Sequence, residues 1–155
     1  MDRLIREGIL RFRLYVAAGL VVLTGSIALA QKMTTPEELD KAMKKVQPAM
    51  QAAQKALKSE AYADVKPQLA TIRQVMVDTR EFWVLHKKDD ALKANEDVMT
   101  KLDAVDKLLS ATPVDPAAVV AGMKAMGGAC LSCHKVYRER DSENNYILKP
   151  SSVGE

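Results

Sequence analysis

Four stretches of the chain carry apolar side chains at intervals of three and four residues, which is the spacing of one face of an α-helix. The sequence therefore predicts helices at about residues 36–57, 67–85, 89–110 and 116–140. Short polar or proline-containing segments separate them, and such short connections are typical of helices that pack antiparallel. The expected fold is all-α, an antiparallel four-helix bundle.

Two of these predicted helices have recognisable first turns. Thr35 and Asp115 are good N-cap residues, and each is followed by a proline that suits the first helical position, Pro36 and Pro116. Pro48 lies inside the first predicted helix, where it removes a backbone donor and crowds the carbonyl group four residues earlier. We therefore expect a kink in that helix.

Residues 1–30 differ in character from the rest of the chain. Four arginines precede a 17-residue apolar run at 14–30, which is short for a membrane-spanning helix. The run ends in Ala28-Leu29-Ala30, the small-x-small pattern of a signal peptidase site, so we expect removal of a secretion signal before Gln31. The alternative is a retained membrane anchor, because the flanking arginines can snorkel to the interface. The expected division is a signal or anchor at 1–30, a helical domain at 31–140 and a polar tail at 141–155.

The charge of the chain follows the same division. The whole sequence has 23 basic and 20 acidic side chains, and residues 1–30 contain four of the basic and two of the acidic ones. The remainder is nearly neutral, with 19 basic against 18 acidic residues. The excess positive charge belongs to the N-terminal segment, as the positive-inside rule describes, and gives no support for nucleic-acid binding.

The run Cys130-Leu131-Ser132-Cys133-His134 is a C-x-x-C-H sequence, the spacing at which a c-type haem is attached. Two cysteine sulfurs can form thioethers with the haem vinyl groups, and the adjacent histidine can bind the iron. On a helix Cys130, Cys133 and His134 lie at i, i+3 and i+4 and project from one face. A thioredoxin-like dithiol requires a βαβ setting and a structural zinc site requires four ligands, and the sequence offers neither. A plain disulfide or dithiol is the remaining alternative.

Three glycines precede this run, Gly122, Gly127 and Gly128. Each costs a helix roughly 1 kcal/mol relative to alanine. Their position indicates that a missing side chain lets a macrocycle or a neighbouring helix approach closely.

The extended run from Gly128 to Arg138 has the form C-x-x-C-H-x-x-Y-R, and it stands late in the last predicted helix. In this the chain resembles class II c-type cytochromes, the cytochrome c′ family and its low-spin relatives, over about residues 34–140. The resemblance implies one covalent haem c held by Cys130 and Cys133, with His134 as the proximal iron ligand. It also implies export to the bacterial periplasm, where such haem attachment takes place. Arg138 lies one turn beyond His134 and either contacts a haem propionate or is a solvated arginine at the helix end.

The sixth iron ligand distinguishes two kinds of protein within this family. Low-spin relatives use a methionine of the first helix, whereas cytochrome c′ proper leaves that position open for nitric oxide or carbon monoxide. Met43 stands where the low-spin relatives have their ligand, and Met50 is the second choice on the same face. Methionines on a buried stripe also serve as simple packing residues. His86 is a further candidate, although its charged neighbours favour a solvated histidine.

The function expected from these residues is periplasmic electron transfer through a Met/His-ligated low-spin haem, with redox proteins as partners. The alternatives are a five-coordinate gas-binding cytochrome c′ and a membrane-tethered haem subunit of a larger redox complex. A homodimer is compatible with the sequence, and the membrane is a partner only if residues 1–30 are retained. We find no constellation of catalytic acid, base or nucleophile, so the chain is not expected to be an enzyme.

Overall fold

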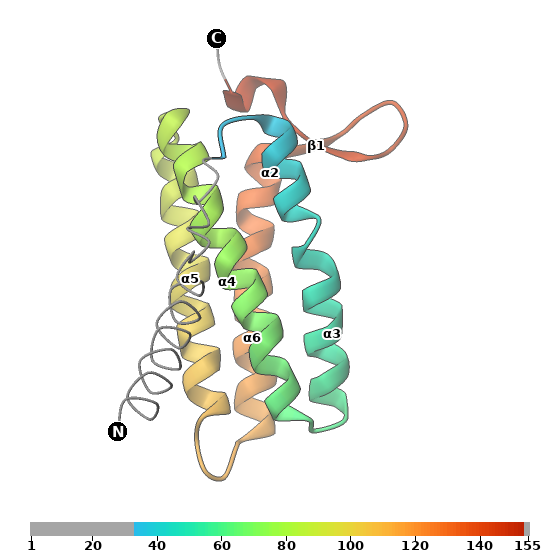
Figure 1. Cartoon of the computed structure of the whole chain (residues 1–155), viewed down its shortest axis with the longest axis vertical. Coiled ribbons are helices and arrows are strands. Elements are labelled where there is room, and N and C mark those ends of the chain that lie inside the picture. The colour runs from blue at the N-terminus through green and yellow to red at the C-terminus, as the bar shows by residue number, and fades with distance from the viewer. Residues whose placement is uncertain (1–32, 154–155) are drawn as a thin grey trace, which may run out of the picture. The chain divides into compact units, whose positions relative to one another are not determined.

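The computed structural model describes residues 33–153, and the predicted signal or anchor at 1–30 and its cleavage site before Gln31 lie outside them. The described part of the chain is mostly α-helical, as the all-α prediction requires, with one small two-stranded sheet near its end (Figure 1). The elements are α2 (Pro36–Met43), α3 (Val46–Lys58), α4 (Tyr62–Leu85), α5 (Asp89–Leu109), α6 (Pro116–Tyr137), β1 (Arg138–Arg140), β2 (Tyr146–Leu148) and a final 3-10 helix, η1 (Pro150–Val153).

The long helices pack in chain order, α3 against α4, α4 against α5 and α5 against α6. They alternate in direction, so that α3 and α6 also run antiparallel to each other (Figure 1). The short helix α2 contacts α3, α4 and strand β2. The centre of the core consists of fully buried side chains from α4, α5 and α6, among them Ile72, Phe82, Leu102, Val105, Val119 and Met126.

The first predicted helix is present as two helices, α2 and α3, with a break at Lys44 and Lys45. The break lies one turn before Pro48, the place at which the proline ring crowds the backbone carbonyl of the preceding turn. The backbone tightens there, because the N–H of Lys45 donates to the carbonyl oxygen of Ala42 at 3.0 Å, three residues back. The expected disturbance is therefore present as a two-residue break at which Lys44 and Lys45 keep right-handed helical dihedral angles.

Both predicted N-caps are present. The hydroxyl of Thr35 accepts from the backbone N–H of Glu38 at 3.2 Å, and the Glu38 carboxylate accepts from the N–H of Thr35 at 3.1 Å, which completes a capping box. The Asp115 carboxylate accepts from the N–H of Ala118 at 3.1 Å. Helix α4, in contrast, begins at Tyr62 and not at Pro67.

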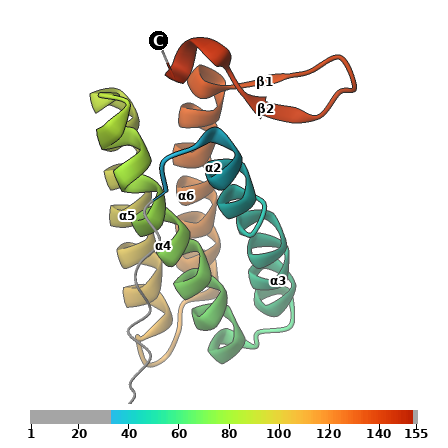
Figure 2. The same cartoon turned by 45° about the horizontal axis from the view of Figure 1, so that its top comes forward.

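The structure differs from the predicted C-terminal tail. Helix α6 ends at Tyr137, and the next three residues pair with β2 in an antiparallel hairpin that projects away from the helices (Figure 2). The guanidinium groups of Arg138 and Arg140 lie over the ring of Tyr146, at 3.7 and 3.9 Å from its centroid. At the turn, the Asp141 carboxylate accepts from the backbone N–H of Asn145 at 2.8 Å. The stacked side chains and the aspartate turn give a polar segment enough contacts to fold.

The three glycines of α6 differ in their surroundings, which yields a test of the packing. A Cβ atom at Gly122 would lie 2.9 Å from the Cγ2 atom of the buried Val105 on α5, whereas a Cβ at Gly128 would meet no atom within 4 Å. Gly122→Ala relieves a helix penalty of about 1 kcal/mol but overpacks this contact, which typically costs about 1–3 kcal/mol. We expect a net loss of about 1 kcal/mol in the free energy of unfolding, measured in urea.

The matched control is Gly128→Ala on the same helix. With open space around its new methyl group, this variant should gain about 0.5–1 kcal/mol. Equal effects of the two substitutions would contradict the close approach of α5 and α6 at Gly122.

Candidate functional site

Helix α6 carries Cys130, Cys133 and His134 on a single turn, and all three side chains are half-buried. The two residues between the cysteines, Leu131 and Ser132, are exposed. Both cysteines are free thiols in the structure. The structure thus brings together on one helix face the three residues that the sequence singled out, as their i, i+3, i+4 spacing requires.

A groove of about 410 Å³ lies between α3 and α6, and its lining on α6 ends at Gly127, before Cys130, Cys133 and His134. Such a volume lies within the range of roughly 300–1,000 Å³ that is typical of ligand sites. Gly127, one turn before Cys130 and Leu131, lies at its edge. The groove is lined mainly by apolar residues from both helices, Met50, Leu57, Val120, Met123 and Gly127, together with Gln54, Lys58 and Lys124.

The apolar surface of α6 is poorly covered in the described part of the chain. Only 22% of the most apolar stretch of this helix is buried, and the side chains of Val120 and Leu131 are 57% and 50% exposed. At Gly127 and Gly128 a Cβ atom would meet nothing within 4 Å. By length and composition α6 also matches a membrane span, but it packs against α5 along the domain. The side of α6 that faces the groove therefore has room for a flat apolar group.

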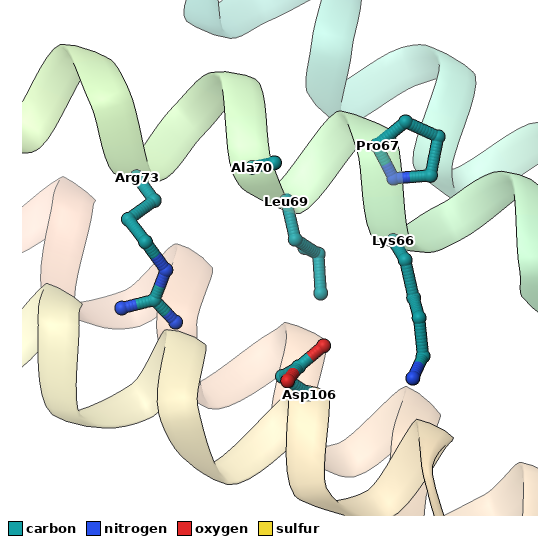
Figure 3. A pocket seen from close by; sticks show the side chains of 6 residues that line it. All are labelled: Lys66, Pro67, Leu69, Ala70, Arg73 and Asp106. Atoms are coloured by element: carbon teal, nitrogen blue, oxygen red, sulfur yellow. The ribbon is translucent and has the colours of Figure 1, made fainter.

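A second crevice of about 410 Å³ lies between α4 and α5 (Figure 3). Its two cationic side chains already have partners, because Lys66 donates to the hydroxyl of Ser110 at 2.8 Å and Arg73 pairs with Asp103 at 2.6 Å. None of the residues predicted from the sequence to bind a cofactor lines it. It is therefore separate from the candidate site.

The electrostatic setting of the thiols disfavours a redox-active dithiol. Burial raises the pKa of Cys130, and burial together with the charges of Cys130 and Asp90 raises the pKa of Cys133 to about 11. Both side chains are therefore neutral thiols at pH 7. Catalytic C-x-x-C motifs instead have a cysteine whose pKa is lowered so that it reacts as a thiolate.

His134 is held in the form that binds metals. Burial lowers the pKa of its imidazole, and the positive charge of Arg138 lowers this pKa further. The ring is therefore neutral at pH 7, and a neutral imidazole nitrogen is the ligand that iron takes. Arg138 itself stands at the start of β1 with its guanidinium stacked on Tyr146. Its contact with a propionate stays a prediction.

The two methionines predicted for the sixth position lie on different helices. Met43 is the last residue of α2 and Met50 lies on α3, and both are half-buried against the core. Met50 lines the groove together with Gly127. Met43 lies before the break at Lys44 and Lys45, and it is not among the residues that line the groove.

His86 is less exposed to solvent than we expected from the charged residues next to it in the sequence. It caps the C-terminus of α4, its ring lies 4.4 Å from that of Phe82, and its Nε2 atom is buried without a hydrogen-bond partner among the residues described. The expectation of a solvated histidine was wrong, because the ring packs on the aromatic side chain one turn earlier.

The sequence analysis did not anticipate the contacts of Tyr137. Its hydroxyl donates to the carboxylate of Asp90 at the start of α5, and its ring lies 4.8 Å from that of Trp83 on α4. Tyr137 was noted only as part of the extended motif. The one signal in the sequence that Tyr137 lies near the candidate site was its position, one turn after Cys133 and His134 on the same helix.

Within residues 33–153, no three or more His, Cys, Asp or Glu side chains are grouped so that they could hold a metal ion. No protein-family model matches the chain, and no similar protein was found among curated proteins or among solved structures.

Proposed function

We propose that the chain is an exported mono-haem cytochrome of class II that carries single electrons between redox proteins. The observation that carries the proposal is the turn of α6 on which two neutral thiols and one neutral imidazole share a face beside an open apolar groove. When bound, haem supplies a one-electron centre at its iron. In this proposal α2 and α3 together form the first helix of an antiparallel four-helix bundle, and α4, α5 and α6 form the other three.

The residues present fit a covalently bound haem in three respects. Cys130 and Cys133 have the spacing for two thioethers, and His134 follows at the position from which it can reach the iron. The side of α6 that faces the groove is mainly apolar, with Gly127 where a macrocycle would approach. A bound haem would cover this surface, which is otherwise an unusual exposure for a soluble domain.

Met43 is the proposed sixth ligand. The resemblance to the low-spin relatives supports this choice, because their ligand is a methionine of the first helix; Met50, which lines the groove together with Gly127, is the second choice. A methionine thioether stabilises ferrous iron and raises the reduction potential, which suits an electron carrier. Lys58 and Lys124 line the groove, and Arg138 at the start of β1 is the proposed partner of a propionate.

The second candidate is a five-coordinate cytochrome that binds nitric oxide or carbon monoxide. The open space between α3 and α6 favours it, because a small ligand could reach a vacant iron position through this groove. Export to the periplasm, or anchoring to its membrane, depends on residues 1–30 in either case.

Carbon monoxide binding separates the two candidates. The full-length gene is expressed in a bacterium with a c-type haem maturation system, and the purified protein is reduced and mixed with carbon monoxide. An electron carrier with Met43 on the iron should show little or slow binding, limited by dissociation of the thioether, and a reversible one-electron redox titration. Immediate and complete binding would support the gas-binding candidate and contradict the electron carrier.

A further inference from the structure

Asp90 is held against the haem-binding helix by a contact that spans two helices. The hydroxyl of Tyr137 on α6 donates to the Asp90 carboxylate on α5, and the tyrosine is 7% exposed. The ring of Tyr137 packs on Trp83, which in turn meets the buried Phe82 edge-on at 5.0 Å between ring centroids. The tyrosine is thus fixed on its ring side by aromatic packing and on its hydroxyl side by a charged acceptor.

This contact brings a negative charge to the cofactor side of α6. Tyr137 lies one helical turn after Cys133 and His134, so its hydrogen-bond partner lies near the same face. Lys88, two residues before Asp90, partly offsets the negative charge of Asp90, and Arg138, one turn after His134, brings a positive charge near the imidazole.

A fixed carboxylate beside a redox centre stabilises the oxidised state, because that state carries one more positive charge than the reduced state. Asp90 is itself exposed, so the hydroxyl of Tyr137 matters because it keeps the carboxylate against α6; without this partner the aspartate would extend into water and be screened more strongly. Asp89, the preceding residue, makes no hydrogen bond or ion pair to α6 in the described part of the chain.

We infer that Asp90, held by Tyr137, is a positioning residue that lowers the reduction potential of the haem attached at Cys130, Cys133 and His134. The inference rests on the proposed function. It assigns the Tyr137–Asp90 pair a role in setting the driving force for electron exchange, in addition to joining α5 to α6.

The test is a redox titration of the full-length, haem-loaded protein and five variants. Asp90→Asn keeps an acceptor for the tyrosine hydroxyl but removes the charge, so the potential should rise by an amount equal to about a threefold change in the equilibrium constant, where tenfold is about 59 mV for one electron. Asp89→Asn removes the same charge from the same helix terminus and should change the potential much less. Asp90→Glu keeps the negative charge, so its potential should stay close to the wild-type value.

Tyr137→Phe keeps the ring against Trp83 and should give part of the rise that Asp90→Asn gives. Combining Tyr137→Phe with Asp90→Asn should shift the potential no further than Asp90→Asn alone, because the charge that the hydroxyl holds in place has already been removed. Equal shifts for Asp89→Asn and Asp90→Asn, or a wild-type potential in Asp90→Asn, would overturn the inference. A preparation that contains no covalent haem would instead refute the proposed function, so the two failures are distinguishable by absorption spectroscopy before titration.

Discussion

Replacing Cys130 and Cys133 together by alanine should abolish covalent attachment of haem. In the proposed attachment each sulfur forms one thioether, and no other cysteine exists in the chain to replace them. In the wild type, haem should stay with the polypeptide through denaturing electrophoresis and through extraction with acidified acetone. In the double variant, any haem that still occupies the groove should be removed completely by either treatment.

Ser132→Ala is the matched control for this experiment. Ser132 lies between the two cysteines, is exposed, and donates its hydroxyl only to the Gly128 carbonyl of its own helix, at 3.1 Å. It should retain the full content of covalent haem. Wild-type protein from which acidified acetone removes all haem would contradict the attachment chemistry.

Replacing Met43 by alanine should have the second largest effect. The variant lacks the methionine sulfur that we propose as the sixth iron ligand. The ferric spectrum should therefore change from low-spin to high-spin, and the reduction potential should fall. The methionine–iron charge-transfer band near the red edge of the visible range should disappear. These changes are measured by absorption spectroscopy and by a redox titration.

Met50→Ala is the matched control, since it makes the same substitution two turns further along the first helix. It should enlarge the groove and leave the low-spin spectrum unchanged. A ferric protein that is already high-spin and does not respond to Met43→Ala would contradict the assignment of Met43. Loss of the low-spin spectrum in Met50→Ala alone would assign the ligand to Met50.

The mostly helical structure could be predicted from the sequence because it depends on local signals. The apolar spacing of three and four residues located the long helices, and the caps at Thr35 and Asp115 located two of their starts. Pro48 indicated the disturbance in the first helix, although its effect is a break one turn earlier. The C-terminal hairpin was missed because it depends on pairing between residues 138–140 and 146–148 and on arginine stacking over Tyr146, which helical periodicity does not report.

Some features of the candidate site could likewise be predicted from the sequence, and others depend on the fold. Cys130, Cys133 and His134 lie on one turn of helix, so their shared face follows from sequence spacing alone. The groove, the place of Met43 relative to His134 and the Tyr137–Asp90 contact all depend on how helices far apart in sequence pack together. The contrast between Gly122, which packs on α5, and Gly127 and Gly128, which face open space, also needed the structure.

The central claim is that this chain holds a covalent haem on α6, and the absorption spectrum of the purified wild-type protein in both oxidation states tests it most directly. After expression with a c-type maturation system, we expect the bands of a thioether-linked haem, a low-spin ferric form and a methionine–iron charge-transfer band. A protein that is folded and helical under the same conditions but has no haem absorption would contradict the claim.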